Sequence, residues 1–384
     1  MDSRTSPLLF ALLRSAIGET TLTEEERKLY APERLQELLK VTAKHDVVHL
    51  LVLGLKKNGL LSAQGDAEKY IFKAVYRYER LQYEYAVLCD AFEKAKIPFL
   101  PLKGAVLRAY YPEGWMRTSC DIDVLVHREH LERAISYLQE HYKYVEKERA
   151  THDVSLFSPA GIHVELHFDL VEEGRANRAI EVLRTVWDNV SLCENSEYRY
   201  EMTDAFFYFY HIAHMAKHFE NGGCGIRPFI DLWLLQTIAG KEPQEREVLL
   251  KKGGLLRFEQ SAQSLSKMWF SQGASDETLL QMQSFILRGG SFGTTDNRVA
   301  AQQKDKGRMG YLMSRVFVPY ERLVRYYPVL KKHKWLMPVM QVRRWCMILR
   351  PDVAKRTKHE MTVNQRVSRE TVFETQNLMQ HIGL

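Results

Sequence analysis

Two aspartates stand at the start of an apolar stretch, "DIDVLV", whose composition predicts a β-strand. Because side chains alternate across a strand, Asp121 and Asp123 share one face, while Ile122 and Val124 share the other. Two carboxylates so close repel each other, and one tends to keep a proton unless a cation compensates them. Oxygen ligands with no cysteine beside them suit Mg²⁺ or Mn²⁺ better than zinc.

A second acidic strand follows in "IHVELHF", where Glu165 shares a face with His163 and His167. If this strand pairs beside the first, Glu165 faces the same cleft as the two aspartates. Three carboxylates there would suit a one-metal or two-metal site for in-line displacement at phosphorus. A lone D-x-D is weak and is often only a charged strand end, so the second strand carries much of this prediction.

A glycine turn precedes both strands in "LKG", ahead of the short helical segment "AVLRAYY". Gly104 would let a phosphate approach the backbone N–H groups at the start of the helix, and Lys103 adds a cation. The stretch is not a P-loop, because GxxxxGK[ST] is absent. By itself it fits an ordinary strand-to-helix turn.

The elements around these motifs predict an α+β fold, a small mixed-sheet module flanked by N-terminal and C-terminal helical regions. Residues 1–96 form the first helical region, with the clearest helical periodicity at about 67–95. Short strands and an amphipathic helix alternate over 97–203, where Pro159-Ala160-Gly161 is a turn between antiparallel strands. Residues 204–384 are again mainly helical, with a basic tail.

Composition is ordinary for a globular protein, at 45% hydrophobic and 27% charged residues. Five scattered cysteines without a CxxC motif fit a reducing compartment, and we expect a cytoplasmic protein. The sequence has no run of about 18 or more apolar residues, so it predicts no membrane-spanning helix.

The excess of basic residues is confined to one segment: residues 321–360 hold eleven Lys or Arg and three acidic residues. That segment is either a solvated helical face or a contact for anionic lipid or an acidic partner.

The sequence resembles the nucleotidyltransferase superfamily related to DNA polymerase β, and more closely a bacterial family of uncharacterised nucleotidyltransferases. The motifs that carry this resemblance are "PLKG", the following Arg, "DIDVLV" and "VELHF". The resemblance spans about residues 97–240. It implies that Asp121, Asp123 and Glu165 bind metal and carry catalysis, and that the Gly104 turn binds triphosphate. The superfamily turn usually reads Gly-Ser, whereas this chain has Lys103-Gly104-Ala105.

The resemblance further implies nucleotidyl transfer, with Mg²⁺ or Mn²⁺ as cofactor and an NTP, by family habit ATP, as donor. A hydroxyl on a small molecule or protein attacks the α-phosphate and pyrophosphate leaves; a nucleic-acid partner is not expected. Lys103, Arg117 and Ser119 are then nucleotide-binding candidates. Arg117 could instead support only the aspartates.

Three histidines, His211, His214 and His218, fall on roughly one face of a helix, and Asp231 precedes a further apolar stretch. They could be core histidines lining a cleft, a zinc site, or groups that bind the acceptor. The resemblance includes a helix of the form HxxxH and a later Asp, which match His214, His218 and Asp231. With His167, these are the accessory candidates.

Two alternatives stay open from the sequence. A degenerate nucleotidyltransferase fold could serve as a binding or regulatory module, which the missing Ser at the turn favours and the three acids oppose. A D-x-D glycosyltransferase is less consistent, because such enzymes usually place a nucleotide-binding α/β half before the motif, and here about 95 helical residues precede it.

Overall fold

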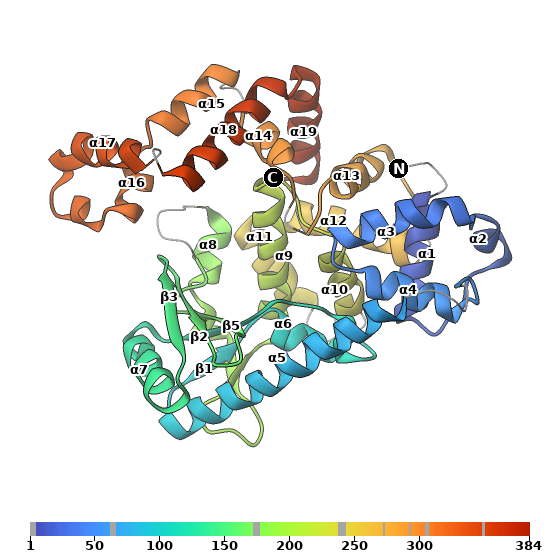
Figure 1. Cartoon of the computed structure of the whole chain (residues 1–384), viewed down its shortest axis with the longest axis horizontal. Coiled ribbons are helices and arrows are strands. Elements are labelled where there is room, and N and C mark those ends of the chain that lie inside the picture. Colours follow the sequence, from blue (N-terminus) through green and yellow to red (C-terminus); the bar gives the residue numbers. More distant parts are fainter. Residues whose placement is uncertain are drawn as a thin grey trace.

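A five-stranded mixed sheet lies at the lower left of the molecule in Figure 1, beside α7 and α5. The computed structural model describes residues 5–61, 67–171, 177–236, 243–271, 273–291, 293–303, 307–347 and 350–384. The sheet order is β1-β2-β5-β4-β3, and only β2 and β5 are parallel neighbours. The strands are β1 (Phe99–Pro101), β2 (Asp121–Val126), β3 (Val145–Arg149), β4 (Asp153–Phe157) and β5 (His163–His167).

The two faces of this sheet differ in chemistry. Ile122 and Val124 of β2, with Val164 and Leu166 of β5, are buried in one apolar cluster. Helices α5 (Glu68–Ala95) and α7 (Leu131–Tyr142) complete that cluster, and Figure 1 shows both against the sheet. The period of two along each strand therefore turns the alternate, polar residues to the opposite face.

Helices precede and follow the sheet, which confirms the predicted α+β class with its helical flanks. The N-terminal helices before α5 are α1 (Thr5–Ile17), α2 (Glu24–Lys28), α3 (Leu35–Lys44) and α4 (Val48–Lys57). The helices that follow the sheet are α8 (Arg178–Leu183), α9 (Asp204–Glu220), α10 (Arg227–Gln236), α11 (Pro243–Gly253), α12 (Leu256–Phe270), α13 (Glu277–Arg288), α14 (Thr295–Gln303), α15 (Gly307–Val316), α16 (Tyr320–Tyr326), α17 (Met337–Met347), α18 (Pro351–Arg366) and α19 (Arg369–Ile382).

One large apolar core joins both helical regions to the sheet. It includes residues of α1 and α4 at the N-terminus, α9, α10 and α12 after the sheet, and Leu125 of β2. Helix α9 is buried along most of its length, from Ala205 to Phe219. Because α9 packs so deeply, its polar side chains have fixed positions beside the polar face of the sheet.

Details at the ends of elements were less predictable. The segment "AVLRAYY" forms only the four-residue α6 (Gly104–Leu107) and a 3₁₀ turn, Arg108–Tyr110. A small hairpin of β6 (Val190–Leu192) and β7 (Tyr200–Met202) was not expected from the sequence. No helix in the described part of the chain is long and apolar enough to cross a membrane.

Candidate active site

The polar face of the sheet brings the three predicted carboxylates onto adjacent strands. In the parallel register of β2 and β5, Asp123 lies opposite Glu165 and Asp121 opposite His163. The prediction that the two acidic strands pair is therefore confirmed. Their placement follows from the apolar alternate positions, since a slip by one residue would bury the acids and expose the core side chains.

Asp123 is the most buried of the three acids, at 4% exposure. Its Oδ1 accepts a hydrogen bond from Lys103 Nζ at 2.7 Å and lies 3.0 Å from His167 Nε2. Burial alone would raise the pKa of Asp123, but the Lys103 ammonium and the hydrogen bond from His167 hold that pKa well below its usual range. Asp123 is therefore a fixed carboxylate at neutral pH.

Lys103 reaches Asp123 from the turn that precedes α6. Its backbone has a φ of 42° and a ψ of −110°, a conformation that side-chain-bearing residues rarely adopt. Strained backbone of this kind is common where a side chain must be aimed at a functional group. The positively charged Lys103 thus lies against the acids instead of pointing freely into solvent.

The pKa of Asp121 is shifted in the opposite direction from that of Asp123. Burial and the neighbouring negative charge of Asp123 raise the pKa of Asp121 above its ordinary value. Two carboxylates with pKa values pushed apart by their surroundings are typical of functional sites. A cation placed between them would relieve the repulsion that raises the pKa of Asp121.

Glu165 links the two halves of the site. Ligand atoms of Asp121, His163 and Glu165 lie within 4.8 Å of one another, as do those of Asp123, Glu165 and His167. Among the described residues, no such group contains both aspartates. Each group combines Glu165 with an imidazole, whereas the sequence indicated carboxylate ligands alone, and that ligand set stays a prediction.

This donor set fits a divalent cation. Carboxylate oxygens are the ligands that Mg²⁺ and Mn²⁺ prefer, and Mn²⁺ also accepts imidazole nitrogen. Burial and then the charge of Asp123 raise the pKa of Asp121, and a cation at the site would lower it. The two groups share Glu165, so an ion could be held by Asp121, Glu165 and His163, or by Asp123, Glu165 and His167. A third group, His152, Asp153 and His167, adjoins this site.

Arg117 and Asp231 form a buried ion pair that the sequence did not suggest. Asp231 Oδ1 accepts from Arg117 Nε at 2.8 Å, and Oδ2 accepts from Nη2 at 3.0 Å. Tyr111 donates a further hydrogen bond to Oδ1 at 2.8 Å. Burial would raise the pKa of Asp231, but Arg117 lowers it. Asp231 thus fixes Arg117, and no hydrogen bond to His214 or His218 is found among its described contacts.

The remaining nitrogen of Arg117 faces the glycine turn. A Cβ built at Gly104 would lie 3.0 Å from Arg117 Nη1 and 3.3 Å from Ser119 Oγ. Only glycine leaves this space open without displacing one of those groups. The structure therefore brings three predicted nucleotide-binding residues together, Gly104, Arg117 and Ser119.

Arg108 joins them and was missed by the sequence analysis. It is 5% exposed, donates to Ser119 Oγ, and its Nε has no partner among the described residues. Burial and the nearby Arg117 lower the pKa of Arg108 to about 10, so it stays charged at neutral pH. A basic residue inside the apolar "AVLRAYY" segment was the available signal.

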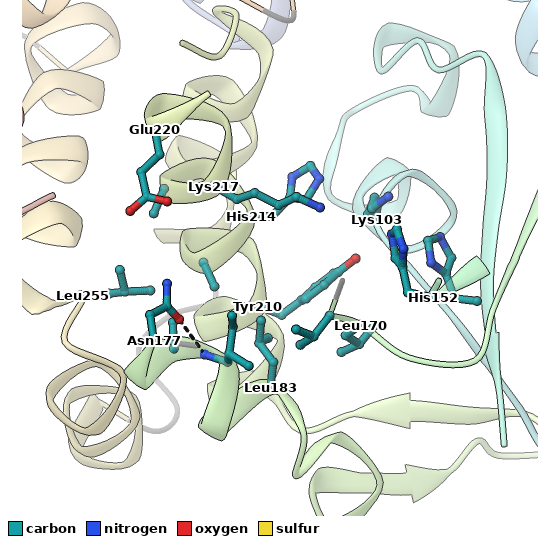
Figure 2. Close-up of a pocket in the computed structure, with 16 residues that line it drawn as sticks. Lys103, His152, Leu170, Asn177, Leu183, Tyr210, His214, Lys217, Glu220 and Leu255 are labelled. Atoms are coloured by element: carbon teal, nitrogen blue, oxygen red, sulfur yellow. Dashed lines mark hydrogen bonds between the residues drawn. The ribbon is translucent and has the colours of Figure 1, made fainter. Parts of the chain in front are cut away.

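A cavity lies between Lys103 and His167, at the polar face of the sheet, and α9, and Figure 2 shows its lining. One end holds Lys103, His152, His167, Tyr210 and His214; the Tyr210 hydroxyl points toward Lys103. The other end holds Asn177, Glu220 and Leu255. The lining also includes Lys217 and a set of apolar side chains: Leu170, Val171, Ala179, Ile180, Leu183, Ala213 and Ala216. Tyr210 was another residue that the sequence did not single out.

The helix α9 histidines form a pair rather than a metal site. His218 Nε2 lies 3.2 Å from His214 Nε2, while His211 Nε2 lies 3.0 Å from the carbonyl oxygen of Pro228. Burial lowers the pKa of His218 to about 4, and burial with the Lys103 charge holds that of His214 well below its usual range. Among the described residues, no metal-ligand group includes any of them.

Comparison with known proteins supports this geometry at the level of the family. Searches of curated proteins and of solved structures return no match. One family model, described as an uncharacterised nucleotidyltransferase, matches residues 31–271, which is more than half of the chain and contains the sheet, the acids and α9. The chain therefore belongs to this family of uncharacterised nucleotidyltransferases.

Proposed function

We propose that the chain is a divalent-metal-dependent nucleotidyltransferase within the superfamily related to DNA polymerase β. It moves a nucleoside monophosphate, AMP from ATP, onto a hydroxyl of a small molecule or protein. The observation that carries this proposal is the parallel pairing of β2 and β5, which sets Asp123 opposite Glu165 on the face that also holds Asp121. Family membership supports the reaction class.

In the proposed step the acceptor oxygen attacks the α-phosphorus, and the bond from that phosphorus to the oxygen bridging to the β-phosphate breaks. Pyrophosphate leaves with the bonding electrons, and Glu165 takes the hydroxyl proton. The divalent cation, when bound, neutralises charge on the phosphates. Asp121 and Asp123 would hold that cation, and Lys103 with His167 keeps Asp123 ionised and in place.

The phosphates of the donor would lie over the Gly104 turn. With only four residues, α6 contributes little helix dipole, so charge must come from side chains. Arg108, Arg117 Nη1 and the Ser119 hydroxyl converge there. We propose that Ser119 supplies the hydroxyl that superfamily members carry directly after the glycine, where this chain has Ala105.

The acceptor would enter from the cavity between the sheet and α9. One end adjoins Lys103 and Tyr210, where a hydroxyl would approach the reacting phosphate, and the apolar side chains of the lining would hold the body of the molecule. His214, neutral at physiological pH because of its lowered pKa, can accept a hydrogen bond from the acceptor. Such a lining favours a hydroxyl compound with an apolar portion.

One contact supports the alternative that the fold is a regulatory module. Lys103 Nζ donates a hydrogen bond to Asp123 Oδ1, and a bound cation would compete with Lys103 for that oxygen. If Lys103 keeps that position when nucleotide binds, the fold would bind nucleotide without transferring it. Titration of the chain with Mn²⁺ in the presence and absence of ATP separates the two functions, since the enzyme requires cation binding at the acids.

The test of the proposal is incubation with α-labelled NTPs, Mg²⁺ or Mn²⁺, and cell extract. Wild-type protein should transfer label to an acceptor, and the Asp121→Asn/Asp123→Asn variant should not. Asp90→Asn is the matched control, because Asp90 forms an exposed ion pair with Lys94 on α5. Nucleotide binding without transfer under every condition would favour the regulatory module.

A further inference from the structure

Residues 318–347 form a small unit that we call the basic arm. It contains α16, two 3₁₀ turns and α17, and Figure 1 shows it at the far end of the molecule from α13 and the N-terminal helices. Its own apolar cluster centres on Val318, Leu323 and Leu330, separate from the main core. The arm is therefore held together internally while most of its surface faces outward.

One face of α17 is apolar and exposed. Trp335, Val339 and Val342 are 74%, 54% and 52% exposed, and Cys346 is exposed as well. Trp335 lies in the 3₁₀ turn just before α17, and Val339, Val342 and Cys346, spaced three and four residues apart, lie along one side of the helix. We call these four residues the apolar stripe. Exposed apolar residues scattered singly are normal, but a continuous stripe with an exposed Trp indicates an interaction surface.

Contacts on the opposite side fix the orientation of the stripe. The buried Gln341 donates to the carbonyl oxygen of Val318 at 2.5 Å, and Trp345 Nε1 donates to that of Val316 at 2.8 Å. Arg344 donates to the carbonyl oxygen of Arg315 at 2.7 Å. With those side chains bound to the preceding segment, α17 cannot rotate its stripe inward without losing them.

The charge around the stripe has one sign. No acidic residue occurs between Glu321 and Asp352. Lys332, Lys334 and Arg343 are exposed near the stripe. Lys334 and Arg343 lie over the rings of Tyr320 and Tyr327, which position these cations, and Glu321 is the one acidic residue in the sequence of the arm. A partner for this face must therefore supply negative charge beside an apolar interior.

We propose that the basic arm docks on the surface of an anionic lipid bilayer, with the apolar stripe inserted among the headgroups. A bilayer offers both required features, because Trp favours the interface and Lys or Arg is attracted to anionic headgroups. A second copy of this chain is disfavoured, because two basic arms would repel each other. This docking is independent of the transfer reaction.

The test is co-sedimentation of the full chain with vesicles of phosphatidylcholine containing about 30 mol% phosphatidylglycerol, beside vesicles of phosphatidylcholine alone. We expect binding to the anionic vesicles only, weakened as salt rises from about 0.1 M to about 0.5 M. Trp335→Ala/Val339→Asp, and separately Lys332→Glu/Lys334→Glu, should each reduce the bound-to-free ratio at least about tenfold.

Two controls match these changes. Phe72→Ala removes a side chain of similar exposure, 70%, from α5, and Lys355→Glu/Lys358→Glu reverses two charges on α18, outside the arm. Both should bind vesicles as wild type does, and all variants should unfold at the wild-type temperature. Absence of vesicle binding, or equal loss in test and control variants, would overturn the proposal. Binding of an acidic polypeptide such as polyglutamate in place of vesicles would overturn it in favour of a protein partner.

Discussion

The polar face of the sheet and the basic arm both contain many charged side chains, but the charges on the sheet are buried and paired, whereas those on the arm are exposed. On the sheet, Asp123 is buried and compensated by Lys103 and His167, and Arg117 is buried against Asp231. On the arm, Lys332 and Lys334 are exposed, with no acid nearby in the chain. Buried, paired charge fixes the geometry of a reaction site, whereas exposed charge of one sign attracts a partner.

The largest expected effect is on the sheet. Asp123→Asn should lower label transfer by about 10³-fold or more, because it removes a carboxylate proposed to hold the cation and also removes the anchor of Lys103. Initial rates with α-labelled ATP measure this. The isosteric change and near-wild-type circular dichroism would exclude unfolding, and retention of most of the rate would remove Asp123 from the reaction.

The ion pair beneath the site should matter for stability. Arg117→Met leaves Asp231 buried without its cation, so the free energy of unfolding should fall by about 3 kcal/mol or more. Urea titration measures the loss. The double variant Arg117→Met/Asp231→Leu should recover much of that stability but not the binding of nucleotide; full recovery of both would mean that Arg117 has only a structural role.

These residues also mark the limit of sequence reasoning. The pairing of β2 with β5 was predictable, because the alternation around Asp123 and Glu165 determines one face and one register. The Arg117–Asp231 pair joins α10 to the segment before β2, and only the packing of α10 on the sheet region brings them together. Neither local spacing nor composition indicated it, and both alternatives weighed for Arg117 omitted Asp231.

Arg108 and Tyr210 were missed for a similar reason. Both lie in apolar segments where periodicity predicts core residues, and in each case the structure places a polar end toward the site. The histidines of α9 show the converse. Their shared face was predictable from helical spacing, but the sequence could not distinguish a metal site from the His214–His218 pair.

A smaller effect on activity is expected from the residues proposed to bind the nucleotide phosphates. Arg108→Met should raise the KM for nucleotide by about tenfold to a hundredfold, because a charged hydrogen bond to phosphate contributes about 1.5–3 kcal/mol. The rate at saturating nucleotide should change less. Arg108→Lys is the control, since it should recover part of the affinity; an unchanged KM in Arg108→Met would remove Arg108 from the nucleotide site.

The neutral histidines predict a pH dependence of stability. His218 has a folded-state pKa of about 4, below its unfolded value, so the unfolded chain binds a proton that the folded chain does not. Stability should therefore fall as pH drops from about 6.5 toward 4, by about 3 kcal/mol for this group. Urea titrations across that range should show a shallower fall in His218→Gln; an equal slope would exclude His218 as the cause.

The smallest effect is expected on the arm. Lys332→Gln/Lys334→Gln should change the free energy of unfolding by less than about 0.5 kcal/mol, because exposed charges contribute little to stability. Thermal and urea unfolding measure this beside Lys355→Gln/Lys358→Gln. A loss comparable to that of Arg117→Met would show that the arm charges are structural, and the contrast between the two regions would fail.

The most direct test of the central claim compares ATP labelled at the α-phosphate with ATP labelled at the γ-phosphate, using purified protein, Mn²⁺ and an acceptor fraction from extract. Nucleotidyl transfer predicts a product that carries the α label and lacks the γ label, because the γ label is released in pyrophosphate. The Asp121→Asn/Asp123→Asn variant should form no such product. A product carrying the γ label, or α-label transfer that persists in that variant, would contradict the assignment of these carboxylates to nucleotidyl transfer.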